Sequence, residues 1–126
     1  MLYNIDKKQY MDFIPYEDDF NTWRRRITED EYNRIFDELN TRIEGDEIHT
    51  SSWIPGSDWS GTVFEPIYEK ACRQDIDASA KFFGLILWEV IRRRDDVWSY
   101  GRYEKNGIPI KGLTYFKLMI RPEGNS

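Results

Sequence analysis

The stretch from Ala78 to Arg93 constrains the fold of this chain more than any other part of its sequence. At helical spacing, one broad apolar face of this stretch consists of Phe82, Phe83, Ile86, Leu87, Val90 and Ile91. Leu85 and Trp88 interrupt the opposite, polar side. A helix that is apolar nearly all round must be buried by several neighbours, so we expect this helix at the centre of the fold.

A second helix is predicted from Thr28 to Glu44, because its first turn has the sequence of a capping box. The hydroxyl of Thr28 can accept from the backbone N–H of Glu31, whose carboxylate can reach back to the backbone of Thr28. One apolar stripe follows at helical spacing, made of Tyr32, Ile35, Phe36, Leu39 and Ile43. Two pairs of opposite charge are spaced for i,i+4 contacts with the acid first: Asp30 with Arg34, and Glu38 with Arg42. This pattern indicates a surface helix with one buried face.

The residues from Pro66 to Arg94 have a helical pattern but are too many for one helix. At 1.5 Å per residue such a helix would be about 43 Å long, whereas a compact domain of this length is roughly 35 Å across. We therefore expect a break at Asp75–Asp77, with Asp77 as the N-cap of the central helix. Pro66 is expected in the first turn of the shorter helix, where its missing N–H has no cost.

The C-terminal third has the pattern of a β-hairpin, because Asn106-Gly107 is a strong type I′ turn signal between two aromatic-rich runs. The expected register places Trp98 opposite Tyr115 and Glu104 opposite Pro109. One face of the hairpin is expected to pack on the central helix. The other face needs a cover, which either the N-terminal segment or a second copy of the chain would supply. Weaker strand candidates are Glu47–Ile54 and Phe20–Ile27.

These patterns predict an α+β fold in which about three helices pack on a small, mainly antiparallel sheet that includes the C-terminal hairpin. We expect residues 1–126 to form a single domain, with its first residues and residues 122–126 frayed at the ends. Cys72 is the only cysteine, so the chain can form no internal disulfide, which is typical of a reducing compartment. With no long apolar run that would span a membrane, the chain is expected to be cytoplasmic.

The net charge of −5 opposes generic binding to nucleic acids, whose phosphates require a positive surface. Two arginine triplets, Arg24–Arg26 and Arg92–Arg94, would form a phosphate-binding patch if they met in space. Trp23 and Trp98 would then supply stacking surfaces. A local nucleic-acid binder is therefore kept as an alternative, disfavoured by the acidic balance.

His49 and Cys72 are the obvious pair for nucleophilic catalysis, but Cys72 lies at a helical spacing where cysteine behaves as a small buried hydrophobe. One histidine and one cysteine are too few soft ligands for a structural zinc site, and we expect no metal or cofactor. Glu89 lies in the middle of the central helix and is expected to pair with Arg92, Arg93 or Arg102. A small hydrolytic enzyme that uses carboxylates with His49 stays as an alternative.

The loop SSWIPGSDWSGTVFEP, residues 51–66, has two tryptophans on either side of a Pro-Gly turn. Either both indoles fold inward as anchors, or one stays exposed and contacts a partner. We expect Trp53 to point into the core and Trp59 to stay partly exposed beside Asp58, because Trp59 lies between turn residues. Aromatic and arginine side chains are frequent in interfaces. The candidate binding residues are therefore Trp59, Asp58, Trp53, Trp88 and Arg102.

The function expected from these features is a non-enzymatic cytoplasmic protein-interaction or regulatory module. Its partner would be another protein or a second copy of the chain, with no membrane involved.

Overall fold

The computed structural model describes residues 1–44, 48–50, 59, 61–101, 104–105, 108–109 and 114–118, and every structural statement below concerns these residues. The helices are α1 (Glu17–Arg24), α2 (Glu29–Ile43), the short η1 (Ile67–Ala71) and α3 (Ile76–Arg93). The strands are β1 (Leu2–Asn4), β2 (Gln9–Met11), β3 (Ile48–Thr50), β4 (Trp98–Gly101), β5 (Glu104–Lys105), β6 (Ile108–Pro109) and β7 (Thr114–Lys117). The α+β class with a small sheet is confirmed.

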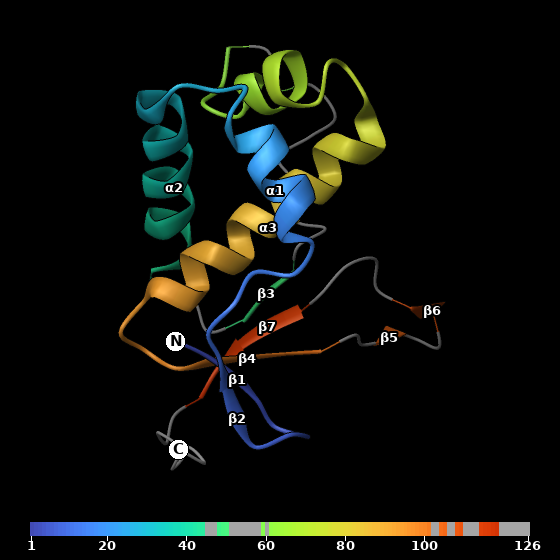
Figure 1. Ribbon diagram of the computed structural model, residues 1–126. Coiled ribbons are helices and arrows are strands. Elements are labelled where there is room, and N and C mark those ends of the chain that lie inside the picture. The colour runs from blue at the N-terminus through green and yellow to red at the C-terminus, as the bar shows by residue number, and fades with distance from the viewer. Residues whose placement is uncertain are drawn as a thin grey trace.

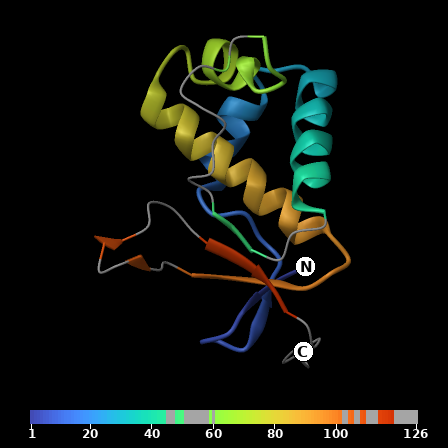
Figure 2. The same cartoon turned by 180° about the vertical axis from the view of Figure 1, so that it is seen from behind.

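The helices lie together on one side of a mixed sheet whose strand order is β2-β1-β4-β7-β3 (Figure 1). Helix α3 runs between the sheet and the other helices, as both Figure 1 and Figure 2 show. Its buried residues lie on every side, and they include Leu85, Trp88 and Glu89 of the side that the sequence marks as polar. The prediction of a central helix buried by several neighbours is therefore correct. None of the helices in the described part of the chain is long and apolar enough to cross a membrane.

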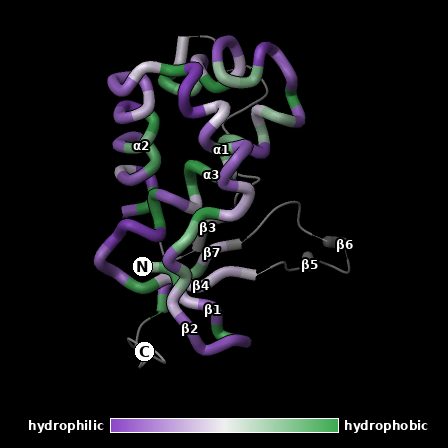
Figure 3. Tube along the Cα trace, viewed as in Figure 1, coloured by the Kyte–Doolittle hydropathy of each residue, from purple (hydrophilic) through white to green (hydrophobic). Residues whose placement is uncertain are grey.

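Helix α2 begins as predicted. The backbone N–H of Glu31 donates to Oγ1 of Thr28 at 3.1 Å, and the backbone N–H of Thr28 donates to Oε1 of Glu31 at 2.9 Å, which completes the capping box. The predicted ion pairs are formed as well: Arg34 with Asp30 at 2.9 Å, and Arg42 with Glu38 at 2.7 Å. Figure 3 shows hydrophobic and hydrophilic residues alternating along α2, as a helix with one buried face requires.

The break before the central helix lies two residues earlier than predicted. The N-cap of α3 is Asp75, not Asp77, and its carboxylate accepts from the backbone N–H of Ala78 at 3.0 Å. Arg73 and Gln74 reverse the chain directly before it, with φ angles of 51° and 67°. Because this reversal leaves Asp75 in an extended conformation, the first helical turn starts there, and Asp77 falls within that turn, where a carboxylate is also favoured.

The segment that contains Phe20 is helix α1, so the prediction of a strand at Phe20–Ile27 is wrong. Three acids occupy the positive end of α1, and Arg24 lies in its last turn. The rings of Phe20 and Trp23, three positions apart, both contact the ring of Phe82 in α3, with centroids at 5.8 Å and 5.6 Å. Contact with one residue from positions three apart is a helical spacing, which a strand would not give.

The predicted strand register of the C-terminal hairpin is correct near the tip and differs by two residues near the base. Glu104 pairs with Pro109 as predicted, but Trp98 pairs with Lys117 instead of Tyr115. Only residues 102–103 separate β4 from β5, whereas residues 110–113 separate β6 from β7, so the return strand has two extra residues. Since side chains alternate with a period of two, this shift keeps each residue of β7 on its predicted face.

The N-terminal segment extends the sheet and covers Trp88 of the central helix. Strand β1 joins the sheet beside β4, where Leu2 aligns in parallel with Trp98, and β2 pairs with β1. Beyond β2, the backbone carbonyl of Phe13 accepts from Nε1 of Trp88 at 2.9 Å. The terminal ammonium of Met1 donates to the backbone carbonyl of Asp96 at 2.7 Å. The chain itself therefore covers Trp88, whereas the cover expected for the face of the hairpin away from α3 stays a prediction.

Candidate docking groove

Two of the five predicted binding residues, Trp59 and Trp88, lie in the described part of the chain, and Trp53, Asp58 and Arg102 lie outside it. Trp59 is only 9% exposed, and its ring lies 6.1 Å from that of Phe64 and 5.8 Å from that of Phe83. The expectation that its indole is partly exposed is wrong. The residue types next to Trp59 in the sequence favour turns, but Phe64 and Phe83 of α3 supply the apolar contacts.

Trp88 is buried as well. Its ring lies 4.9 Å from that of Tyr100 in the sheet and 6.4 Å from that of Phe13. Because its indole N–H is bonded to the Phe13 carbonyl, this tryptophan fills the space between α3, the sheet and the N-terminal segment. Neither indole presents a surface for a partner in this conformation.

The side chains considered for catalysis do not assemble within the described residues. Cys72 is buried, and burial raises the pKa of its thiol to about 11, so it is protonated at neutral pH. The prediction that Cys72 is structural agrees with this burial. His49 lies in β3 opposite Tyr115, and its side chain is outside the described part. In the ranges that the structure describes, no three His, Cys, Asp or Glu side chains come close enough to hold a metal ion.

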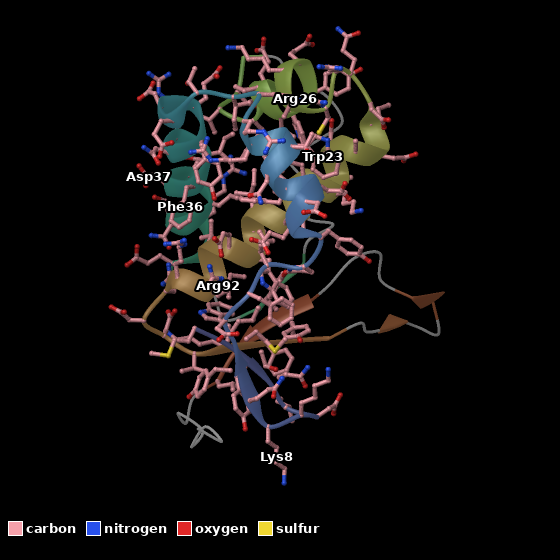
Figure 4. All side chains as sticks on the ribbon, viewed as in Figure 1. Lys8, Trp23, Arg26, Phe36, Asp37 and Arg92 are labelled. Carbon is pink, nitrogen blue, oxygen red and sulfur yellow. The ribbon has the colours of Figure 1, made fainter. Side chains whose placement is uncertain are left out.

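The two arginine triplets are largely occupied by contacts within the chain. In the first triplet, Arg24 pairs with Glu29 at 2.5 Å, and Arg26 donates to the backbone carbonyl of Ala71 at 2.7 Å. In Figure 4, Arg26 lies beside η1 and Arg92 lies near the sheet, at opposite ends of the helical layer. This arrangement lends no support to a joint phosphate-binding patch.

Glu89 is paired within the second triplet, as predicted. Its carboxylate is buried, and it accepts from Nε of Arg92 at 2.5 Å and from Nε of Arg93 at 3.3 Å. The hydrogen bond to Glu89 is the main reason why the pKa of Arg92 is raised. A buried carboxylate that accepts from two guanidinium groups has its hydrogen-bonding needs met within the fold.

A groove of about 500 Å³ lies between α2 and the C-terminal end of α3. The last turns of these two helices lie side by side in Figures 1 and 2. The groove is lined by Phe36, Asn40, Glu44, Val90, Arg93, Arg94, Asp95 and Asp96. Phe36 and Val90 supply apolar surface, and the polar residues come from the ends of both helices.

One wall of the groove is held in place by Arg94 and Asp96. The guanidinium of Arg94 donates to both carboxylate oxygens of Asp96, at 2.9 Å and 3.0 Å, and to Oδ1 of Asn40 in α2 at 2.5 Å. Nε1 of Trp98 in β4 donates to the same carboxylate at 2.9 Å. Although burial opposes it, these hydrogen bonds hold the pKa of Asp96 below its usual value. The pair therefore ties α2, the end of α3 and the sheet together.

Other charges of the groove are not satisfied in this way. Among the residues described, the carboxylates of Glu44 and Asp95 take part in no hydrogen bond or ion pair, and both are exposed. The side chain of Arg93 is 62% exposed and pairs with Glu89 of its own helix at 3.3 Å. The groove thus offers an aromatic ring and two carboxylates to a ligand, beside the exposed guanidinium of Arg93, which is paired with Glu89.

The sequence alone gives no prediction that Phe36, Glu44 or Asp95 binds a partner. Phe36 was assigned to the buried stripe of its helix, and its ring is only half-buried. The one feature of the sequence that could have indicated a binding role is the position of the two acids. Glu44 is the C-cap of α2, and Asp95 follows the C-cap of α3. A carboxylate is disfavoured at the negative end of a helix.

Comparisons of the chain with protein-family models, with curated proteins and with solved structures gave no match.

Proposed function

We propose that this protein is a non-enzymatic protein-interaction module whose docking surface is the groove between α2 and the end of α3. The observation that carries the proposal is a groove of about 500 Å³ that combines a half-buried phenyl ring with exposed charges that the fold does not satisfy. Interfaces between proteins typically have such an apolar centre with a polar rim. A cytoplasmic location belongs to the proposal, on the basis of the single Cys72.

The rigidity of the groove supports this function. The Arg94–Asp96 pair and its bond to Asn40 hold the helix ends in position before any ligand arrives. A preformed site loses less conformational entropy on binding than a flexible one. The partner is proposed to be a different protein, because the chain's own N-terminal segment already covers Trp88, which removes the main reason for a second copy.

The test uses the full chain as bait for a displayed library of random peptides. Selected peptides are synthesised, and their affinities are measured for the wild type and for two variants. Phe36→Ala removes the ring that lines the groove, and Tyr16→Ala removes an exposed ring elsewhere and serves as the matched control. Circular dichroism establishes that both variants are folded.

We expect the selected peptides to bind Phe36→Ala about tenfold or more weakly, as when a central aromatic is lost from an interface. Their affinity for Tyr16→Ala should be that of the wild type. The proposal is wrong if no peptide is enriched, or if binding depends on Tyr16 and not on Phe36.

A further inference from the structure

We infer that the groove takes a basic segment of a partner protein, whose lysine or arginine side chain lies on Phe36 near Glu44 and Asp95. The inference rests on the proposed function and adds the chemistry of the ligand. Support for it begins with the positions of the acidic residues along the helices.

Acidic residues occupy the first turns of the longer helices, where the macrodipole favours them. They are Glu17, Asp18 and Asp19 in α1, Glu29, Asp30 and Glu31 in α2, and Asp77 in α3. Glu44 and Asp95 lie instead at the negative, C-terminal ends of their helices. Glu44 is the C-cap of α2, and Asp95 directly follows the C-cap of α3. Their charges destabilise the fold where they stand. Residues that break a local rule without a structural gain are frequently functional.

The next residue shows what a structural acid looks like at the same place. Asp96 accepts from Arg94 and Trp98 and lies 3.7 Å from Nζ of Lys117. Among the described residues, neither the carboxylate of Glu44 nor that of Asp95 accepts a hydrogen bond or forms an ion pair, although Glu44 lies close enough to Arg94 to interact with it electrostatically. Both line the same groove, so a cation bound there would be attracted by two carboxylates and by two helix ends.

Phe36 completes the site because an aromatic face attracts a cation, and it packs against the apolar stem of a lysine or arginine. The chain uses the same contact internally: the guanidinium of Arg24 lies 3.9 Å from the ring centroid of Tyr32, and Nζ of Lys81 lies 4.0 Å from that of Tyr16. In the groove wall, Arg94 is held by Asp96, and Arg93 is held by Glu89. An acidic ligand would have to compete with these carboxylates.

The test measures fluorescence anisotropy with three labelled peptides of equal length, which differ only in whether the charged positions hold arginine, glutamine or glutamate. The protein is the full chain as wild type and as the double variant Glu44→Gln/Asp95→Asn. The matched control, Glu17→Gln/Asp18→Asn, removes the same charge from the start of α1. The unfolding temperature of each variant is measured in parallel.

We expect the arginine peptide to bind the wild type and the control variant equally. It should bind the groove variant about 5- to 30-fold more weakly, as expected for the loss of two exposed ion pairs. The unfolding temperatures should move in opposite directions. The groove variant should melt about 1–5 °C higher because it loses disfavoured charges, and the control should melt lower because it loses favoured ones.

Equal affinity of the arginine peptide for all three proteins would overturn the inference, because it would show only attraction to the net charge. Preference for the glutamate peptide, lost in Arg93→Gln, would also overturn it, while leaving the groove as a protein-interaction site. Failure of all three peptides together with an empty library selection would instead remove the proposed function itself.

Discussion

Replacement of three buried tryptophans by phenylalanine isolates the energy of a single N–H group. Nε1 of Trp88 donates to the Phe13 carbonyl, and Nε1 of Trp98 donates to the Asp96 carboxylate, both at 2.9 Å. Nε1 of Trp59 differs, because it is the buried side-chain donor that finds no acceptor in the described structure. Each substitution removes a similar volume from an indole, so the differences between the variants report mainly on the N–H.

The expected order follows from these contacts. Trp88→Phe loses a neutral hydrogen bond, worth about 0.5–1.5 kcal/mol, and Trp98→Phe loses one to a charged group, worth about 1.5–3 kcal/mol. Trp59→Phe removes a donor whose burial without a partner costs about 1–3 kcal/mol. Trp59→Phe should therefore destabilise the protein by about 2–4 kcal/mol less than Trp88→Phe, and it can even stabilise it.

The assay is equilibrium unfolding in urea, followed by far-UV circular dichroism because the fluorescent side chains themselves are changed. Free energies of unfolding are compared at equal slopes, since a changed slope would mean a changed unfolded state. An equal loss of unfolding free energy in Trp59→Phe and Trp88→Phe would refute the reasoning. It would show that the indole N–H of Trp59 is hydrogen-bonded in solution. Trp59→Ala should cost about 3–5 kcal/mol, as for any buried aromatic.

Four further predictions concern the fold. Arg94→Ala should cost about 2 kcal/mol in urea unfolding and Arg94→Lys should not restore it, because one ammonium cannot replace a bidentate guanidinium. Arg34→Ala, which breaks an exposed pair, should change stability by less than about 0.5 kcal/mol. The free energy of unfolding should fall as the pH rises above about 8.5, because burial raises the pKa of Cys72 in the folded protein to about 11 and the unfolded chain loses the thiol proton first. Cys72→Ala should reduce this dependence of stability on pH. In the folded protein, Cys72 should react slowly with thiol reagents. Deletion of residues 1–13 should expose Trp88 and produce unfolding or self-association in sedimentation, and a stable monomeric truncated chain would contradict this.

Local patterns in the sequence were sufficient for α2 and for the buried character of α3, but not for α1. The capping box at Thr28 and Glu31 and the all-round apolar surface of α3 are read from residues a few positions apart, and both are confirmed. The hairpin tip at Glu104 and Pro109 was predictable for the same reason. Interactions between near neighbours are determined by helix and strand geometry alone, so one sequence is enough to see them.

Long-range contacts were not predictable in this way. The parallel alignment of Leu2 with Trp98 and the burial of Trp59 against Phe83 depend on which distant segment arrives at each surface. The two extra residues in the return strand show the same limit, since the turn determines the register only near itself. The residue types next to Trp59 in the sequence gave no sign of its burial, because its ring packs against Phe64, five residues on, and against Phe83 of the distant helix α3.

The groove depends both on local sequence patterns and on long-range packing, so its residues could not be predicted from the sequence alone. That Glu44 and Asp95 stand at negative helix ends is visible in the sequence once the helices are known. That neither carboxylate forms a hydrogen bond or ion pair among the described residues, and that both line one groove with Phe36, is visible only after α2 and α3 are packed together. An acid at a helix C-terminus is a weak signal alone, because a cation can satisfy it, as Arg94 and the distant Lys117 do for Asp96. It becomes a stronger signal of binding when no cation pairs with it directly in the packed structure, since a ligand from outside can then compensate for a charge that the helix end disfavours.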